Sequence, residues 1–309
     1  MAPVLPTLLF PLRTIAERWK LLPYATPQTY QFSYRVQVRN PATSRRAALI
    51  ACPLPPTLPY QQVRDVRYRT KPDGSEVEPR YHNRFDWWNV QLPAGGSLMI
   101  GYDAIVSVSP RSTELGADLP LRPGPLVGDR YFEVTKQVKE LAAVCARGVL
   151  DQRAYVARCY TYVIGHLRYG RPISGLYRAS EVLTLPEVDC GGYATLLGAL
   201  LLARGIPVRL VVGFWAGYPE AGMHAWLECD NGNGAWAALD PSVEQLYRNG
   251  RTQKSGRRFF VGSDRVVVSL GSDLELLFAG RKVSTPLLQH PAVAGELDAA
   301  YANVTAVSA

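Results

Sequence analysis

The sequence predicts an α+β protein, in which a β-rich N-terminal part precedes a part that mixes helices with antiparallel strands. Three observations support this prediction. Short runs of alternating apolar and polar side chains, typical of half-buried strands, occupy residues 29–108. Apolar residues at helical spacing follow in 129–147, 151–166 and 190–204. Apolar runs of strand length then return from Val208 onward.

The N-terminal part is predicted to form a small β-sandwich. The run TYQFSYRVQV at 29–38 alternates apolar and polar residues, and the runs Asp86–Leu92 and Ser97–Val108 flank a Pro-Ala-Gly-Gly turn. Several short strands separated by turn residues are typical of a sandwich. We therefore expect a β-sandwich domain at 28–110, preceded by an N-terminal arm at 1–27.

The remaining boundaries follow from composition. Residues 111–128 are rich in proline and glycine and poor in large apolar side chains, as in a linker. The helices and strands of 129–290 are predicted to form the second domain, and the weakly patterned residues 291–309 to form a C-terminal tail. In the second domain, Gly205 is expected as the C-cap of the helix at 190–204.

Composition excludes several classes of protein. The chain has 309 residues, of which 47% are hydrophobic and 19% charged, which fits a globular protein with a substantial core. The net charge is +8, but no dense basic cluster or nucleic-acid motif accompanies it, so no nucleic-acid partner is predicted. No apolar run is long enough for a transmembrane helix, and no membrane association is expected.

The cysteines indicate a reducing compartment. Their number is five, which is odd, and their spacing is wide, without a C-x-x-C pair. Free thiols of this kind are typical of cytoplasmic proteins, so a cytoplasmic location is expected. No histidine has metal-ligand spacing, and neither a metal nor another cofactor is predicted. The oligomeric state cannot be predicted from this sequence.

Cys190 is the candidate nucleophile. It stands at the predicted N-terminus of the 190–204 helix, where free N–H groups and the helix dipole favour a thiolate. Gly191 and Gly192 follow, and glycines leave room for a substrate close to the backbone and amides for an oxyanion. Taken alone, a free cysteine is more often a small core residue.

A predicted hairpin supplies the other two candidates. If residues 230–234 form the loop between two strands, Cys229 lies opposite Ala235, and His224 lies opposite Asp240. Directly opposed side chains share one face of the sheet, so the carboxylate could reach the imidazole. A register slip of one residue would separate them. Each residue singly has a plain structural explanation, and their joint placement favours the chemical one.

These three residues suggest acyl transfer through a thioester. His224 would accept the thiol proton and return it to the leaving amine, while Asp240 would hold the imidazole tautomer. Tyr169, Tyr177 and Trp226, together with Gly191, are candidate substrate contacts, although aromatic residues in such positions more often serve packing.

The sequence resembles the transglutaminase-like superfamily, in particular its bacterial members. The resemblance lies in DCGGYATLLGALLLARGIPVRLVVGF at 189–214, HAWLE at 224–228 and ALDPS at 238–242. It implies a papain-like core in which the cysteine-bearing helix packs on an antiparallel sheet, with a Cys190–His224–Asp240 triad that acts on amide bonds. The upstream region is similar to the β-rich N-terminal domain of bacterial members.

Departures from the animal transglutaminases narrow the expected function. Asp189 and Gly191 stand where those enzymes have glutamine and tryptophan beside the cysteine, and their calcium-binding loops have no counterpart here. These differences favour a cysteine hydrolase that cleaves peptide or isopeptide bonds in a peptide or protein substrate. A transglutaminase with an amine acceptor and a non-catalytic binding module that keeps the fold remain alternatives.

Overall fold

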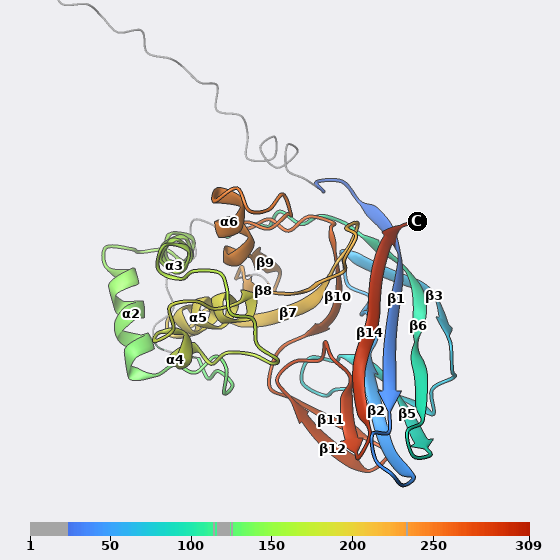
Figure 1. Cartoon of the computed structure of the whole chain (residues 1–309). Coiled ribbons are helices and arrows are strands. Elements are labelled where there is room, and N and C mark those ends of the chain that lie inside the picture. Colours follow the sequence, from blue (N-terminus) through green and yellow to red (C-terminus); the bar gives the residue numbers. More distant parts are fainter. Residues whose placement is uncertain (1–23, 114, 116–123, 125, 233) are drawn as a thin grey trace, which may run out of the picture.

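The computed structural model describes residues 24–113, 115, 124, 126–232 and 234–309. Most of the predicted arm at 1–27 and of the predicted linker at 111–128 therefore lies outside the described residues. The predicted α+β class is confirmed: two sheets form a β-sandwich, and a third sheet carries the helices on its other side (Figure 1). Within the described residues, no helix has the length and hydrophobicity needed to cross a membrane.

The sandwich consists of two four-stranded antiparallel sheets. The first has the order β14-β1-β6-β3, with β1 at Gln28–Arg39, β6 at Ser97–Val108 and β3 at Gln61–Tyr68. The second has the order β13-β2-β5-β4, with β2 at Arg46–Pro53, β5 at Arg84–Leu92 and β4 at Gly74–Val77. Every second side chain of β1 is buried between the sheets, as the alternating sequence predicts.

The C-terminal residues differ from the expected tail. They form β13 (Ala292–Gly295), which pairs with β2, and β14 (Asp298–Ser308), which pairs along nearly the whole of β1. The described buried side chains of β14, such as Ala306, are small, so the strand has little apolar signal of its own. Its conformation is determined by the unpaired edge of β1, which only the folded sheet provides.

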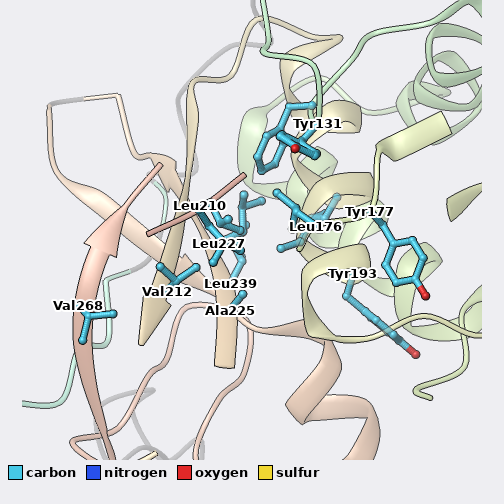
Figure 2. Close-up of a cluster of buried hydrophobic side chains, with 14 of the residues drawn as sticks. Tyr131, Leu176, Tyr177, Tyr193, Leu210, Val212, Ala225, Leu227, Leu239 and Val268 are labelled. Atoms are coloured by element: carbon cyan, nitrogen blue, oxygen red, sulfur yellow. The ribbon is translucent and has the colours of Figure 1, made fainter. Parts of the chain in front are cut away.

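The third sheet positions the candidate site. Its order is β10-β7-β8-β9, with β7 at Val208–Trp215, β8 at Met223–Asp230, β9 at Trp236–Leu239 and β10 at Arg265–Leu270. One of its faces packs on helix α5 (Cys190–Leu202), in which every residue after the first is buried. Figure 2 shows this contact, in which Leu210, Val212 and Leu227 of the sheet extend toward the helical side.

The other helices surround α5. These are α2 (Lys136–Ala146), α3 (Gln152–His166), the single turn α4 (Ala179–Val182) and α6 (Pro241–Arg248), seen together on the left of Figure 1. A helix that is apolar on all sides, like α5, needs such a shell. It therefore forms the centre of the second part of the molecule.

A hairpin connects the two parts of the molecule. It consists of β11 (Leu274–Phe278) and β12 (Arg281–Thr285), and its apolar side packs on Ala51 and Phe85 of the sandwich. The chain then returns through Gln289, whose carbonyl accepts a hydrogen bond of 2.9 Å from the Tyr34 hydroxyl of β1. This hydrogen bond joins β1 of the sandwich to the segment that follows β12.

The register of the β8–β9 hairpin differs from the predicted one. Cys229 pairs with Ala237 instead of Ala235, because β8 continues to Asp230, which pairs with Trp236 at the start of β9. The resulting shift of two positions leaves every side chain on its predicted face. His224 and Asp240 therefore still lie on one side of the sheet, although not directly opposite each other.

Candidate active site

Cys190 is the first residue of α5. The Asp189 side chain caps this helix by accepting a hydrogen bond of 3.1 Å from the Gly192 amide. The backbone N–H groups of Ala225 and Gly191 donate to the Cys190 sulfur. All five cysteines of the chain are free, and Cys190 alone among them is partly exposed. This thiol is therefore the one that a dissolved molecule can reach.

The two glycines after Cys190 serve packing. A Cβ atom on Gly191 would lie 2.8 Å from Leu176 Cδ1, and one on Gly192 would lie 2.7 Å from Val188 Cβ. The Gly192 amide is also occupied by its hydrogen bond to Asp189. The expectation that both glycines leave free amides is thus wrong for Gly192, because the N-cap carboxylate takes that donor first. The Gly191 amide is also engaged, by Asp189 and by the Cys190 sulfur.

His224 and Asp240 are hydrogen-bonded. The distance between His224 Nε2 and Asp240 Oδ2 is 2.9 Å, and both side chains are buried. The second carboxylate oxygen of Asp240 accepts from the Ser242 hydroxyl at 3.1 Å and from the Val243 amide at 3.2 Å. Asp240 is therefore the N-cap of α6, a helix that the Asp-Pro sequence can start but that the sequence analysis did not predict.

A buried arginine shares the Asp240 carboxylate. Arg265 Nη1 lies 2.8 Å from Asp240 Oδ2, the same oxygen that His224 contacts. The two donors, together with the charges of His224 and Arg265, hold the pKa of Asp240 far below its usual range although burial opposes this. Asp240 is therefore ionised at every physiological pH.

Two tryptophans surround the imidazole of His224. Its ring centroid lies 4.5 Å from that of Trp215 and 5.9 Å from that of Trp226, and both pairs are stacked. Burial lowers the pKa of His224, and the positive charges of Arg265 and Lys254 act in the same direction against the attraction of Asp240. The imidazole is thus neutral at pH 7, with Nε2 bound to Asp240 and Nδ1 as the remaining base.

The environment of Cys190 favours the thiol. Burial, together with the nearby charges of Asp189 and Asp240, raises the pKa of Cys190 to about 12, although the amides of Ala225 and Gly191 stabilise the anion. The position of Cys190 at a helix N-terminus predicts instead that a thiolate is favoured. Desolvation and two carboxylates outweigh that effect here, and the resting pair consists of a neutral thiol and a neutral imidazole.

Cys190 and His224 line one pocket with a cavity volume of about 110 Å³. Of the four predicted substrate contacts, Tyr169 and Gly191 also line it, and the Tyr169 phenol hydrogen-bonds the Cys190 thiol. Tyr177 and Trp226 do not line it. The Tyr177 hydroxyl donates to the Arg171 carbonyl at 2.8 Å, and Trp226 is buried behind His224.

Several residues of the site were not found by sequence reasoning. Leu287, Gln289 and His290 line the pocket from the segment that follows β12. Arg265 and Trp215 reach the site from β10 and β7. No local pattern distinguishes these residues from core or surface residues. The only available signal was the expected sheet, in which Trp215 ends a strand beside that of His224.

Comparisons with known proteins bear on the family and the fold. Residues 139–241 match the sequence model of the transglutaminase-like superfamily. A solved structure from Cytophaga hutchinsonii, provisionally described as a cysteine protease, is 16% identical, with a TM-score of 0.55 and 91% of each chain covered. At this identity the similarity concerns the fold. The comparison with curated proteins finds no match.

A second solved structure is more distant. It comes from Parabacteroides distasonis and is provisionally described as a protease. It is 14% identical, covers 74% of this chain and 47% of its own, and has a TM-score of 0.30. No conclusion is drawn from it.

Proposed function

Because residues 139–241 of this chain form a transglutaminase-like domain, we propose that it is a thiol-dependent acyl-transfer enzyme, a cysteine hydrolase that cleaves peptide or isopeptide bonds. One observation carries the proposal. In a single pocket, the one solvent-reachable thiol of the chain lies with an imidazole that is hydrogen-bonded to a buried, ionised carboxylate. This is the set of groups that nucleophilic catalysis by a thiol requires.

The first half-reaction forms a thioester. The Cys190 proton moves to His224 Nδ1 as the sulfur attacks the carbonyl carbon of the substrate, which gives a tetrahedral intermediate with a negative oxygen. The C–N bond then breaks, and the imidazolium gives its proton to the leaving amine. Asp240 stays ionised throughout and stabilises the imidazolium. Because the resting groups are neutral, His224 acts as a general base in this step.

The second half-reaction releases the product. Water attacks the thioester and gives one proton to His224, the C–S bond breaks, and the sulfur takes that proton back. The Cys190 backbone N–H, which has no acceptor within the helix, and the Tyr169 hydroxyl are the candidate donors for the oxyanion. Tyr169 is supported in this role by its hydrogen bond to the thiol itself.

Transfer to an amine is the second candidate function. It uses the same thioester and replaces water by a primary amine. Burial of the site favours it in one respect, because exclusion of water lets an amine compete. A binding module that keeps the fold is the third candidate. The buried Asp240 argues against it, because burying a charged carboxylate costs desolvation free energy, and such groups beside an imidazole are typical of functional sites.

The test is labelling followed by turnover. In the folded protein, iodoacetamide should modify Cys190, whose proton His224 can accept as the sulfur reacts, and spare the buried Cys52 and Cys159, as read by peptide mass spectrometry. Incubation with a mixture of glutamine-containing peptides should then give cleaved or deamidated products in the wild type and none in Cys190→Ala. Products that carry an added primary amine would identify the transferase instead.

The same experiment can overturn the proposal. Product formation that is unchanged in Cys190→Ala would contradict both enzymatic functions, whereas absence of product in the wild type, together with labelling of Cys190 no faster than that of the buried thiols, would favour the binding module. A Cys159→Ala variant is the matched control, since that thiol is buried and lies away from the pocket.

A further inference from the structure

A buried cation belongs to the site but has no part in the acyl-transfer steps. Arg265 has 1% of its surface exposed. Its Nη1 atom lies 2.8 Å from Asp240 Oδ2, while His224 Nε2 lies 2.9 Å from the same oxygen. A fixed charge in this position weakens the attraction between Asp240 and an imidazolium, so its presence calls for an explanation.

The sheet register places the groups together. Arg265 of β10 pairs directly with Trp215 of β7, and Gly213 of β7 pairs with His224 of β8. Residues two apart in a strand share a face. Arg265, Trp215, His224 and Trp226 therefore lie on one face of the third sheet, the face opposite to α5.

The same two indoles contact both the base and the cation. The Arg265 guanidinium carbon lies 4.3 Å from the Trp215 ring centroid and 4.8 Å from that of Trp226. These are the rings that stack on His224. The far end of the guanidinium donates to the Ser255 carbonyl. A planar cation held in this way has little freedom, which suits a positioning role.

We propose that Arg265 is a positioning residue of the acyl-transfer site, which fixes the Asp240 carboxylate against His224 and opposes a lasting proton on that imidazole. The proposal rests on the proposed function, because it assigns Arg265 a role in the same proton transfer. Because Arg265 repels a proton on His224, the imidazole holds the thiol proton only while the tetrahedral intermediate exists. Asp240 is held in one orientation during that time.

Charged groups from several elements surround His224 and Arg265. Asp240 attracts a proton on the imidazole, and Arg265 and Lys254 repel it. Asp189 interacts with His224 from the cysteine helix. Asp264 lies on the far side of Arg265, with Oδ1 3.6 Å from its Nε atom. Of the two cations, Arg265 alone is bonded to Asp240, so its removal should change both the charge and the orientation that His224 experiences.

The test is an NMR titration of the His224 imidazole, which needs no substrate. The chain has four histidines, so a His224→Asn spectrum assigns the resonance. In the wild type, His224 should titrate below 6.5. In Arg265→Met its pKa should rise by about one pH unit, because one repelling charge is lost and the pull of Asp240 is no longer shared. The His224 pKa of Arg265→Gln, which keeps an amide donor without the charge, should rise likewise.

A matched control is available on the same sheet. Arg209 of β7 donates to Glu228 at 2.8 Å and lies 4.3 Å from the Trp236 ring. Arg209→Met therefore removes the same kind of contact at a distance from the site, and the His224 pKa should stay at its wild-type value. A folded Arg265→Met protein with an unshifted His224 pKa would overturn the proposal.

The wild-type protein alone also tests the inference if a variant does not fold. A wild-type His224 that titrates above 6.5 would by itself contradict the inference. The result is also separable from the proposed function. Absence of turnover with a shifted His224 pKa would leave Arg265 as a positioning residue in a site without hydrolase activity, whereas turnover with an unshifted pKa would remove only the role of Arg265.

Discussion

The backbone N–H of Ala225 donates a hydrogen bond to the sulfur of Cys190. The residue directly after the proposed base thus contacts the proposed nucleophile, and helix α5 is joined to strand β8 at the point where both groups meet the pocket. The donor is a main-chain group, so substitutions of Ala225 other than proline leave it in place. It keeps the thiol beside His224 even though α5 and His224 lie on opposite faces of the sheet.

The thiol of Cys190 should be protonated at neutral pH. Its pKa is raised from 9.0 to about 12, so the ultraviolet thiolate absorbance of the wild type minus that of Cys190→Ser should stay flat between pH 7 and 9. The folded protein binds this proton more tightly than the unfolded chain. The contribution of this group to stability is therefore complete below pH 9 and is lost as the pH rises toward 12. Thiolate absorbance at pH 7 would instead indicate a resting ion pair with His224.

Asp240→Ala should destabilise the protein by about 3–5 kcal/mol, because it leaves the Arg265 guanidinium buried without its carboxylate. Urea unfolding measures this loss. The control is Glu275→Ala, which removes an exposed ion pair with Lys282 and should change stability by less than about 1 kcal/mol. Similar losses in the two variants would mean that the buried pair contributes no more than a surface one.

Gln245→Leu should cost about 2–3 kcal/mol of unfolding free energy. The amide of Gln245 donates to the Ile164 and Leu167 carbonyls at 2.7 and 2.6 Å and accepts from the Tyr193 hydroxyl at 2.6 Å. Leucine would fill the space but leave these buried groups without partners. In the matched variant Gln62→Leu, an exposed amide is lost, and stability should stay within about 0.5 kcal/mol. Thermal unfolding of both variants measures the two losses of stability, and equal losses would contradict this prediction.

The pairing of β14 with β1 can be tested on one strand. Val304 has 6% of its surface exposed and faces the sandwich interior, whereas Val307 is 51% exposed on the other face. Val304→Asp buries a carboxylate and should destabilise the protein by several kcal/mol, in contrast to Val307→Asp, which should be nearly neutral. Equal melting temperatures for the two variants would show that β14 does not contribute to the core.

Much of the fold could be predicted from local pattern. The strands at 29–38 and 97–108 alternate in hydrophobicity, and the helix that begins at Cys190 ends just before the predicted Gly205 C-cap. Strand β14 could not be predicted, because its small residues carry no such pattern and its conformation depends on the edge of β1. The register of the β8–β9 hairpin was missed by two positions, since loop composition does not fix where a loop begins.

The sequence by itself determined the candidate reactive groups: a cysteine at a helix start, and a histidine and an aspartate on one side of a hairpin. The prediction that these two share a face held because a register error of two positions leaves every side chain of a strand on the same face. Only the tertiary structure decided their electrostatics. Arg265 comes from β10, which follows β9 in the chain after residues 240–264 and reaches the site only because it pairs with the end of β7 that carries Trp215. The burial that keeps Cys190 protonated likewise depends on segments distant in sequence, such as residues 287–290 of the pocket. Burial and long-range charge depend on packing, which no local pattern encodes.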